Sequence, residues 1–365
     1  MLEISRPIHG SINLNELRLL GLKHDNILDF SANINPLGTP TSVCEAIKNV
    51  ELDIYPDPDC LEIREAISKN ISTPLSKIPI EKIFIGNGSN EILHLLSRII
   101  LSKKSTALIM APTYGEYEFA FRISGADVIN FNADFSKDFR WDFRDVSNLI
   151  KARKPQIVMI CNPNNPTGLY CKQNDIETLA KTSIESGSIL VVDQAYLSFV
   201  EKPWDSLFLL NYSNTILVRS MSKDYAQTAL RLGYALASEN MVSKFRSIQP
   251  DWSVNSLAQK AGISAINDIE YLSKARETVF SSKQFLKKEL TNLGLETVTS
   301  DANFILIKVN NGNKWRSSLL KKGIVVRDCS SFGLPNYIRV GIRKIDDCKI
   351  FVEAINDLLP FVKTK

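Results

Sequence analysis

The sequence contains few of the residues that build metal centres or disulfide frameworks. Its six cysteines are far apart and form no CxxC pair, and its three histidines (His9, His24 and His94) have no ligand spacing. This distribution argues against a zinc site or a disulfide scaffold and fits free thiols in a reducing compartment. We therefore expect no bound metal.

Segments that direct a chain into a membrane or onto nucleic acid are also missing. No apolar run approaches the roughly 18 residues that a membrane-spanning helix needs, and the N-terminus MLEISRPIHG is not organised as a signal peptide. The 44 basic and 40 acidic residues are spread along the chain without a basic block. We expect a cytoplasmic protein with neither a membrane nor a nucleic-acid partner.

The common nucleotide-binding motifs are incomplete. There is no GxxxxGK[ST], which makes an ATP or GTP site improbable, and GNGSNE (86–91) has the first two glycines of GxGxxG but lacks the third. The segment still predicts a tight turn into a helix, with Ser89 or Asn90 as the cap. Amides at such a helix start bind phosphate, although an ordinary strand-to-helix turn has the same pattern.

Short apolar runs alternate with helical patterns through the middle of the 365 residues. This alternation predicts a largely parallel sheet that is buried on both faces. Ligands bind at the carboxyl ends of such strands, so the polar groups that follow each run form the candidate site. The runs lie in KIFIGNGSN (82–90), TALIMAPTYG (106–115), IVMICNPNNPTG (157–168), ILVVDQAY (189–196), ILVRSMSK (216–223) and LGYALAS (232–238).

The pattern changes after about residue 265. Residues 268–294 read as one long amphipathic helix that ends at Gly294, followed by short strands, a helix and a closing helix. We predict a large domain over 41–265 and a smaller α+β domain made of 1–40 and 266–365.

Three residues at the predicted strand ends suggest a cofactor. Asp193 follows four apolar residues and needs a positive partner to stay ionised, either a basic side chain or a protonated ring nitrogen. Lys223 stands beside Ser220, Ser222 and Arg231, which together could hold one phosphate. An amine between a phosphate pocket and a buried carboxylate is the arrangement that pyridoxal phosphate requires, and Tyr114 could stack on its ring.

The order of the motifs resembles that of fold-type I pyridoxal-phosphate enzymes. GNGSNE, APTYGEY, NPNNPTG, VDQAY and SMSK…RLGY are similar to the histidinol-phosphate aminotransferase group of the class I/II aminotransferases, over essentially the whole chain. The 28 residues from Asn165 to Asp193 and the 30 from Asp193 to Lys223 carry much of this likeness. The resemblance implies a mostly parallel seven-stranded sheet between helices and a smaller α+β domain.

The resemblance also implies a role for each matching residue. Lys223 would carry the cofactor as a Schiff base, Asp193 would pair with its pyridinium, and Asn165 and Tyr196 would contact its 3-oxygen. Lys223, Asp193 and Tyr196 are thus the predicted catalytic residues. Tyr114 would stack on the ring, Tyr55 would reach the cofactor of a partner subunit in a homodimer, and the phosphate would be surrounded by Ser89, Asn90, Ser220, Ser222 and Arg231. Gln194 departs from the glutamate that is usual after the aspartate.

Three segments separate two members of the group. HG (9–10), LDFSANINPLG (28–38) and DWSVNSLAQ (251–259) look more like threonine-phosphate decarboxylase. We therefore expect decarboxylation of L-threonine O-3-phosphate to (R)-1-aminopropan-2-yl phosphate, a carbon–carbon lyase reaction of cobalamin biosynthesis. The alternative is a histidinol-phosphate or related aminotransferase that uses glutamate and 2-oxoglutarate.

Both substrates are small phosphorylated amines, so a second anion site is needed. Arg327 and Arg339 are the expected donors, because a guanidinium binds carboxylate or phosphate through two parallel hydrogen bonds. His9, Asn33 and Asn165 would complete the substrate end. Two non-enzymatic alternatives are a pyridoxal-phosphate sensor fused to a DNA-binding module and a scaffold without chemistry. The absence of a spare N-terminal segment and the intact Lys223 and Asp193 argue against them.

Overall fold

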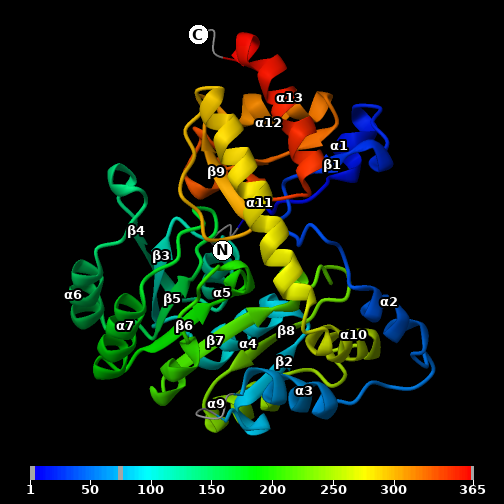
Figure 1. Cartoon of the computed structure of the whole chain (residues 1–365). Helices are drawn as coiled ribbons and strands as arrows, with labels where there is room; N and C mark the ends of the chain where they lie inside the picture. Colours follow the sequence, from blue (N-terminus) through cyan, green and yellow to red (C-terminus); the bar gives the residue numbers. More distant parts are fainter. Residues whose placement is uncertain (1–4, 73–76, 363–365) are drawn as a thin grey trace.

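The computed structural model describes residues 5–72 and 77–362. A large part, built on one wide sheet, lies below a smaller part with two short sheets (Figure 1). The long helix α11 (Tyr271–Asn292) runs from one part into the other. It ends where predicted, with Gly294 in the left-handed region at φ +72°. Among the helices described, none combines the length and apolarity that a bilayer crossing requires.

The wide sheet has seven strands in the order β2-β8-β7-β6-β5-β3-β4. All neighbours from β7 to β4 pair in parallel, and only β8 is antiparallel to its neighbours. This confirms the predicted mostly parallel seven-stranded sheet. The strands are β2 (Ile83–Gly86), β3 (Thr106–Ala111), β4 (Asp127–Asn132), β5 (Ile157–Cys161), β6 (Ile189–Asp193), β7 (Thr215–Ser220) and β8 (Gly233–Leu236).

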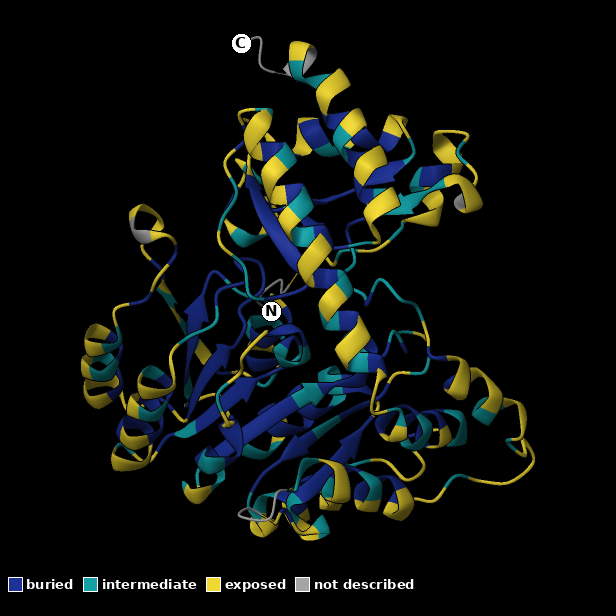
Figure 2. Cartoon of the chain, in the orientation of Figure 1, coloured by how far each residue is buried: buried dark blue, intermediate teal, exposed yellow. Residues whose placement is uncertain are grey.

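Helices cover both faces of this sheet, so its strands are largely buried, except for the edge strand β4 (Figure 2). In β5, Val158 and Ile160 pack on one face, and Ile157 and Met159 pack on the other. The first face meets α2 (Thr41–Lys48), α3 (Leu61–Ile71), α6 (Phe143–Arg153), α7 (Gln173–Glu185) and α10 (Ser256–Asn267). The second meets α4 (Gly88–Ile100), α5 (Glu116–Ile123) and α9 (Glu239–Ile248).

The smaller part joins the N-terminal residues to the C-terminal ones. Strand β1 (Leu28–Asp29) pairs in parallel with β10 (Ile324–Val325). The second sheet has the order β11-β12-β9, with β11 (Arg327–Asp328), β12 (Tyr337–Gly341) and β9 (Phe304–Lys308). Its helices are α1 (Leu14–Leu19), α12 (Gly312–Lys321) and α13 (Ile345–Val362). On this pairing we propose the domain division 41–265 against 1–40 plus 266–365.

Candidate active site

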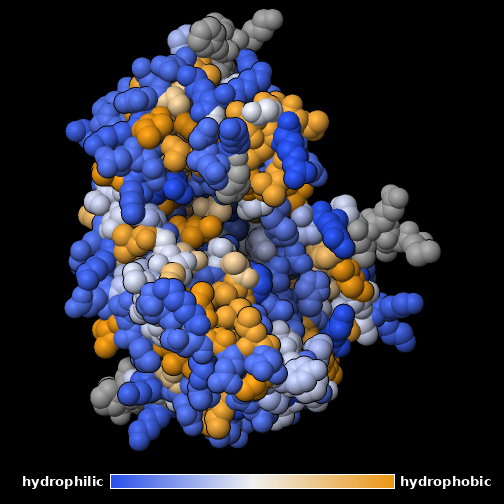
Figure 3. Space-filling model, turned by 90° about the vertical axis from the view of Figure 1, so that its right-hand side faces the viewer, coloured by the Kyte–Doolittle hydropathy of each residue, from blue (hydrophilic) through white to orange (hydrophobic). Residues whose placement is uncertain are grey.

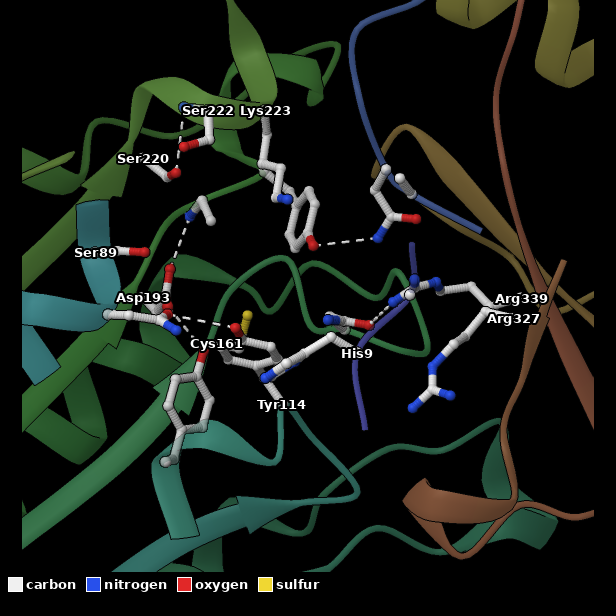
Figure 4. Close-up of a pocket in the computed structure, with 18 of the residues that line it drawn as sticks. His9, Ser89, Tyr114, Cys161, Asp193, Ser220, Ser222, Lys223, Arg327 and Arg339 are labelled. Carbon is white, nitrogen blue, oxygen red and sulfur yellow. Dashed lines mark hydrogen bonds between the residues drawn. The ribbon is translucent and has the colours of Figure 1, made fainter. Parts of the chain in front are cut away.

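A cavity between the two parts, at the carboxyl ends of the parallel strands, collects most of the predicted site residues (Figure 4). Figure 3 shows the hollow between the two parts from the side. The predicted residues that line the cavity are His9, Asn33, Ser89, Asn90, Tyr114, Asn165, Asp193, Tyr196, Ser220, Ser222, Lys223, Arg231, Arg327 and Arg339.

Lys223 lies in the short helix α8 (Met221–Asp224), directly after β7. The amide of Asn35 donates to the carbonyl of Lys223 at 3.0 Å, and the Asn35 side chain donates to the carbonyl of Asp224 at 2.6 Å. These bonds hold the backbone that carries the amine. Burial lowers the Lys223 pKa to about 8, helped by the positive charges of Arg339 and Arg231. The amine is therefore partly neutral, and so nucleophilic, near neutral pH.

Asp193 ends β6 and is buried. The Tyr117 hydroxyl donates to its Oδ2 at 2.8 Å, and the Ala195 amide donates to its Oδ1 at 2.9 Å. Burial raises the pKa of the carboxyl, and these two donors oppose that rise. Within the described residues, no lysine or arginine forms an ion pair with Asp193, which leaves its charge for a cation from outside the chain.

Hydroxyl, amide and guanidinium groups gather at the opposite end of the cavity from Arg327 and Arg339 (Figure 4). Helix α4 begins at Gly88 with Asn87 as its cap residue, so the prediction that Ser89 or Asn90 caps the helix is wrong. The Asn87 side chain makes no cap bond. The amides of the first turn are therefore available to an anion, which the helix dipole also favours.

Gly88 and Arg231 form a close-fitting pair beside these amides. Gly88 has φ +77°, and a Cβ at this position would lie 2.6 Å from Nη2 of Arg231. The Arg231 Nη1 donates to Oγ of Ser222 at 3.4 Å. The absence of a side chain at Gly88 thus lets the guanidinium reach the edge of the helix.

The turn 162–168 sends one of its asparagines into the cavity. Asn165 Oδ1 accepts a hydrogen bond from Nη1 of Arg339 at 2.5 Å. Asn162 and Asn164 instead bond to the amide of Cys171 and the carbonyl of Pro112, so these two polar side chains stabilise the turn. Of the polar side chains in this turn, only Asn165 lines the cavity.

Two further predicted residues meet in the middle of the cavity. The Asn33 amide donates to the hydroxyl of Tyr196 at 3.1 Å, and both side chains are buried. Asn33 Oδ1 has no partner among the described residues, which marks it as a position for a bound group. The Tyr114 hydroxyl donates to Asn90 Oδ1 at 3.3 Å, and burial raises the Tyr114 pKa to about 12.

The substrate end carries two buried guanidiniums. Arg339 donates to the carbonyl of Ser31 at 2.7 Å, while its buried Nε lacks a partner within the described residues. Arg327 donates to the carbonyl of Ile8 at 2.7 Å and to Ser331 Oγ at 2.6 Å. Burial lowers the Arg327 pKa, and the nearby charge of Arg339 adds to this. The two neighbouring guanidiniums therefore favour the binding of an anion at this end of the cavity.

Tyr55 lies outside this cavity. Its side chain is 76% exposed and stacks on Trp252, with ring centroids 4.5 Å apart. Tyr55 therefore makes no contribution to the site of its own chain, and its predicted role toward a partner subunit stays a prediction.

Several pocket residues were not predicted from the sequence. Tyr117 and Cys161 line the cavity beside Asp193, and Phe332 lines it near Arg327. Burial raises the pKa of the Cys161 thiol well above its ordinary value, so it is not a nucleophile at neutral pH. Tyr117 lies three residues after Tyr114 in the same motif, which was the one available signal for it.

Gln194 is placed away from the cofactor cavity. Its Oε1 accepts from Nε of Arg219 at 3.1 Å and from Oγ of Ser206 at 3.2 Å. Glutamine in place of glutamate therefore removes a negative charge next to Arg219 and does not alter the contacts of Asp193.

These donors fit pyridoxal phosphate. The cavity holds an amine with a lowered pKa, a buried carboxylate that has no ion-pair partner among the described residues and, at one end, a set of phosphate donors. Lys223 would hold the aldehyde, Asp193 the ring nitrogen, and Ser89, Ser220, Ser222 and Arg231 the phosphate.

Comparisons with known proteins agree with this reading of the cofactor. The model of the family "Aminotransferase class I and II" matches residues 25–355. A histidinol-phosphate aminotransferase of Caldicellulosiruptor saccharolyticus is 33% identical over 348 residues, which are 94% of each chain. The structure of the histidinol-phosphate aminotransferase from Clostridium acetobutylicum has a TM-score of 0.81 and 28% identity, covering 91% of this chain and 99% of that one.

The expected decarboxylase activity is wrong. Relatives from Caldicellulosiruptor saccharolyticus, Methanococcus aeolicus and Symbiobacterium thermophilum, 31 to 33% identical over 94% of this chain, are histidinol-phosphate aminotransferases. One relative from Caldanaerobacter subterraneus, 32% identical over 90% of this chain and 89% of its own, carries threonine-phosphate decarboxylase as a provisional name. The predicted lyase reaction and the predicted place in cobalamin biosynthesis depended on the decarboxylase activity and lose their support together with that activity.

The structure gives a physical reason for this error. In the segment 251–259, Trp252 packs on Tyr55 outside the cavity, and Asn255 caps α10. Gln259 bonds to the carbonyls of Asp57 and Val254. These side chains stabilise the large part, and none of the three lines the active-site cavity of its own chain. With the match over residues 25–355, the chain belongs to the class I and II aminotransferase family, and its cofactor is pyridoxal phosphate.

Proposed function

We propose that this protein is a histidinol-phosphate aminotransferase, which exchanges an amino group between histidinol phosphate and the glutamate/2-oxoglutarate pair. The observation that carries the proposal is the pair of buried guanidiniums, Arg327 and Arg339, at the end of the cavity away from the phosphate donors of the cofactor. The names of the relatives that span the chain support the choice of amine.

The two guanidiniums suit both substrates in turn. Histidinol phosphate presents a phosphate to them and glutamate presents carboxylates, and a guanidinium fork binds either anion through paired hydrogen bonds. Asn165 orients Arg339 through the bond at 2.5 Å. The same cavity can therefore hold the two partners of the exchange one after the other.

Lys223 is the residue proposed to move protons. When bound, pyridoxal phosphate supplies an aldehyde that combines with amines and a ring that accepts electrons. Lys223 Nζ would take the proton from the substrate carbon that bears the amine, because its lowered pKa of about 8 leaves it partly neutral. Asp193 would hold the proton of the ring nitrogen, and Tyr117 keeps the Asp193 carboxylate in place.

We also propose a homodimer in which Tyr55 reaches the cofactor of the partner subunit. The exposed Leu52, Ile54 and Tyr55 lie in the α2–α3 connection, at the right of Figure 1. That side faces the viewer in Figure 3 and carries a group of apolar side chains. Sedimentation equilibrium tests the dimer, and activity recovered by mixing inactive Tyr55→Ala and Lys223→Ala chains tests the shared site. Cytoplasmic residence stays a prediction.

The activity is tested with the purified holoprotein, histidinol phosphate and 2-oxoglutarate. We expect glutamate to form, and Lys223→Ala to abolish both its formation and the visible absorbance of bound cofactor. Glutamate formed readily from another amine but not from histidinol phosphate would contradict the proposed substrate, while leaving the cofactor assignment intact.

A further inference from the structure

Two of the three histidines of the chain meet at one buried carboxylate. Glu116, the first residue of α5, has a side chain that is only 8% exposed. Its Oε1 accepts from Nε2 of His94 at 2.9 Å, and its Oε2 lies 3.2 Å from Nε2 of His9. Within the described residues these side chains do not form a metal-binding group. The proposed reaction assigns no role to Glu116 or His94.

His9 is the member of this cluster that lines the active-site cavity. Its ring lies 5.4 Å from that of Tyr114, and Figure 4 shows it between Tyr114 and the two arginines. Glu116, in the large part, therefore holds the imidazole at the substrate end. A buried carboxylate needs such partners, and two imidazole donors satisfy one oxygen each.

The backbone on either side of His9 lies against the substrate arginines. Arg327 donates to the carbonyl of Ile8 at 2.7 Å. A Cβ at Gly10 would lie 3.0 Å from Nη2 of Arg339 and only 2.3 Å from the carbonyl oxygen of Ser31, so the chain passes close against both. The backbone around His9 thus packs against the small part, while the His9 ring contacts Glu116 of the large part.

One buried nitrogen at this end, Nε of Arg339, has no partner within the part of the chain that the structure describes. His9 directs its Nε2 at Glu116, and its partly exposed ring lines the same cavity. An imidazolium donates from both ring nitrogens, so His9 can join the Glu116 carboxylate on one side to an anion on the other. An imidazole beside two guanidiniums, one of which has an unpaired buried nitrogen, points to a highly charged anion.

We propose that Glu116 is a positioning residue that holds His9 as a third donor, after Arg327 and Arg339, for the substrate phosphate. His94 occupies the second oxygen of Glu116 and thereby fixes the direction of the first. This proposal rests on the proposed function. It concerns the recognition of a phosphate as opposed to a carboxylate, since a phosphate offers three oxygens and a carboxylate two.

The kinetic test compares histidinol phosphate with histidinol, which lacks the phosphate. For His9→Ala and Glu116→Gln we expect KM for histidinol phosphate to rise about tenfold, the loss of one charged hydrogen bond. We expect kcat to change less than about twofold, and KM for histidinol to stay the same. The matched control is Glu118→Gln, the next acid on α5, whose carboxylate pairs with Arg122, and both KM values should be unchanged there.

Coupling between the two residues separates positioning from a structural role. The double variant His9→Ala/Glu116→Gln should be no worse than either single variant, because each removes the same contact. Glu116→Asp, which keeps the charge, should recover part of the affinity. Additive effects, or equal losses for histidinol and histidinol phosphate, would overturn the proposal.

Direct binding keeps this test independent of the proposed function. If the holoprotein transfers the amino group of neither amine to 2-oxoglutarate, the proposed function fails, and calorimetric titration with inorganic phosphate still measures the site. Affinity about tenfold weaker in His9→Ala and in Glu116→Gln, at equal cofactor content and melting temperature, supports the role of the pair. Unchanged affinity in both variants overturns it.

Discussion

Arg327 and Arg339 stand directly opposite one another across the antiparallel pair β11–β12. Both side chains are buried, 7% and 4% exposed. Like charges at opposing positions of two strands destabilise each other, and their burial adds to this effect. A bound anion would therefore stabilise this pair of arginines. The two positive charges are 12 residues apart in the sequence but lie side by side at the cavity.

Removing one of these charges should separate anion binding from folding. In Arg327→Met we expect KM for histidinol phosphate to rise about 100-fold, the loss of two charged hydrogen bonds. We expect inorganic phosphate to raise the melting temperature of the unaltered protein and to leave that of Arg327→Met unchanged. Arg316→Met is the control, because Arg316 pairs with Glu16 and does not line the active-site cavity. A phosphate effect that persists in Arg327→Met would contradict this assignment.

The close approach of Gly88 to Arg231 predicts a defect confined to the cofactor. In Gly88→Ala the new methyl group displaces the guanidinium, and we expect pyridoxal-phosphate affinity to fall about tenfold through the loss of one charged hydrogen bond. Gly187→Ala is the matched control: φ is +72°, similar to that of Gly88, and no atom lies within 4 Å of its Cβ. It should lose a comparable amount of backbone stability and keep its cofactor affinity. Equal affinity in the two variants would contradict the prediction.

The carboxyl of Asp224, next to Lys223, predicts a pH-dependent stability. Burial raises its pKa from 3.8 to about 7, despite donors from Ser198 Oγ at 3.1 Å and the Tyr225 amide at 3.0 Å. Between these values the folded chain keeps a proton that the unfolded chain has lost, so this contribution to stability falls as pH rises from about 4 to 7. Asp224→Asn should remove it, a difference of at most about 4 kcal/mol.

Urea unfolding of the cofactor-free protein at pH 5 and pH 8 measures this effect. The gain in stability of Asp224→Asn over the unaltered chain should be larger at pH 8. An equal difference at the two pH values would show that Asp224 does not titrate in this range.

Lys223 should react with acylating reagents at a lower pH than the other lysines. Its pKa of about 8, lowered by burial and by Arg339 and Arg231, predicts that the labelling rate of the cofactor-free protein levels off above pH 8. Mass spectrometry of labelled peptides follows each lysine separately. In Arg339→Met the midpoint should move upward, because one positive charge is removed. A midpoint near 10.5 in the unaltered chain would contradict the lowered pKa.

Local sequence patterns predicted most of the sheet but missed β4. Its residues alternate between exposed and partly buried positions because it is an edge strand, so it shows no continuous apolar run. The predicted cap of α4 was misplaced by two or three residues, since asparagine and serine are both common cap residues. Neither error changed which predicted site residues line the cavity.

The sequence by itself determined the fold class, the family and the residues proposed to hold the cofactor. Strands buried on both faces leave a continuous apolar signal, and the polar groups at their ends stand at regular distances along the chain. Only the tertiary structure decided which groups meet at the substrate end. Ile8, His9, Glu116, Arg327 and Arg339 come from distant segments, and their convergence depends on how the small part packs on the large one, which no local periodicity encodes.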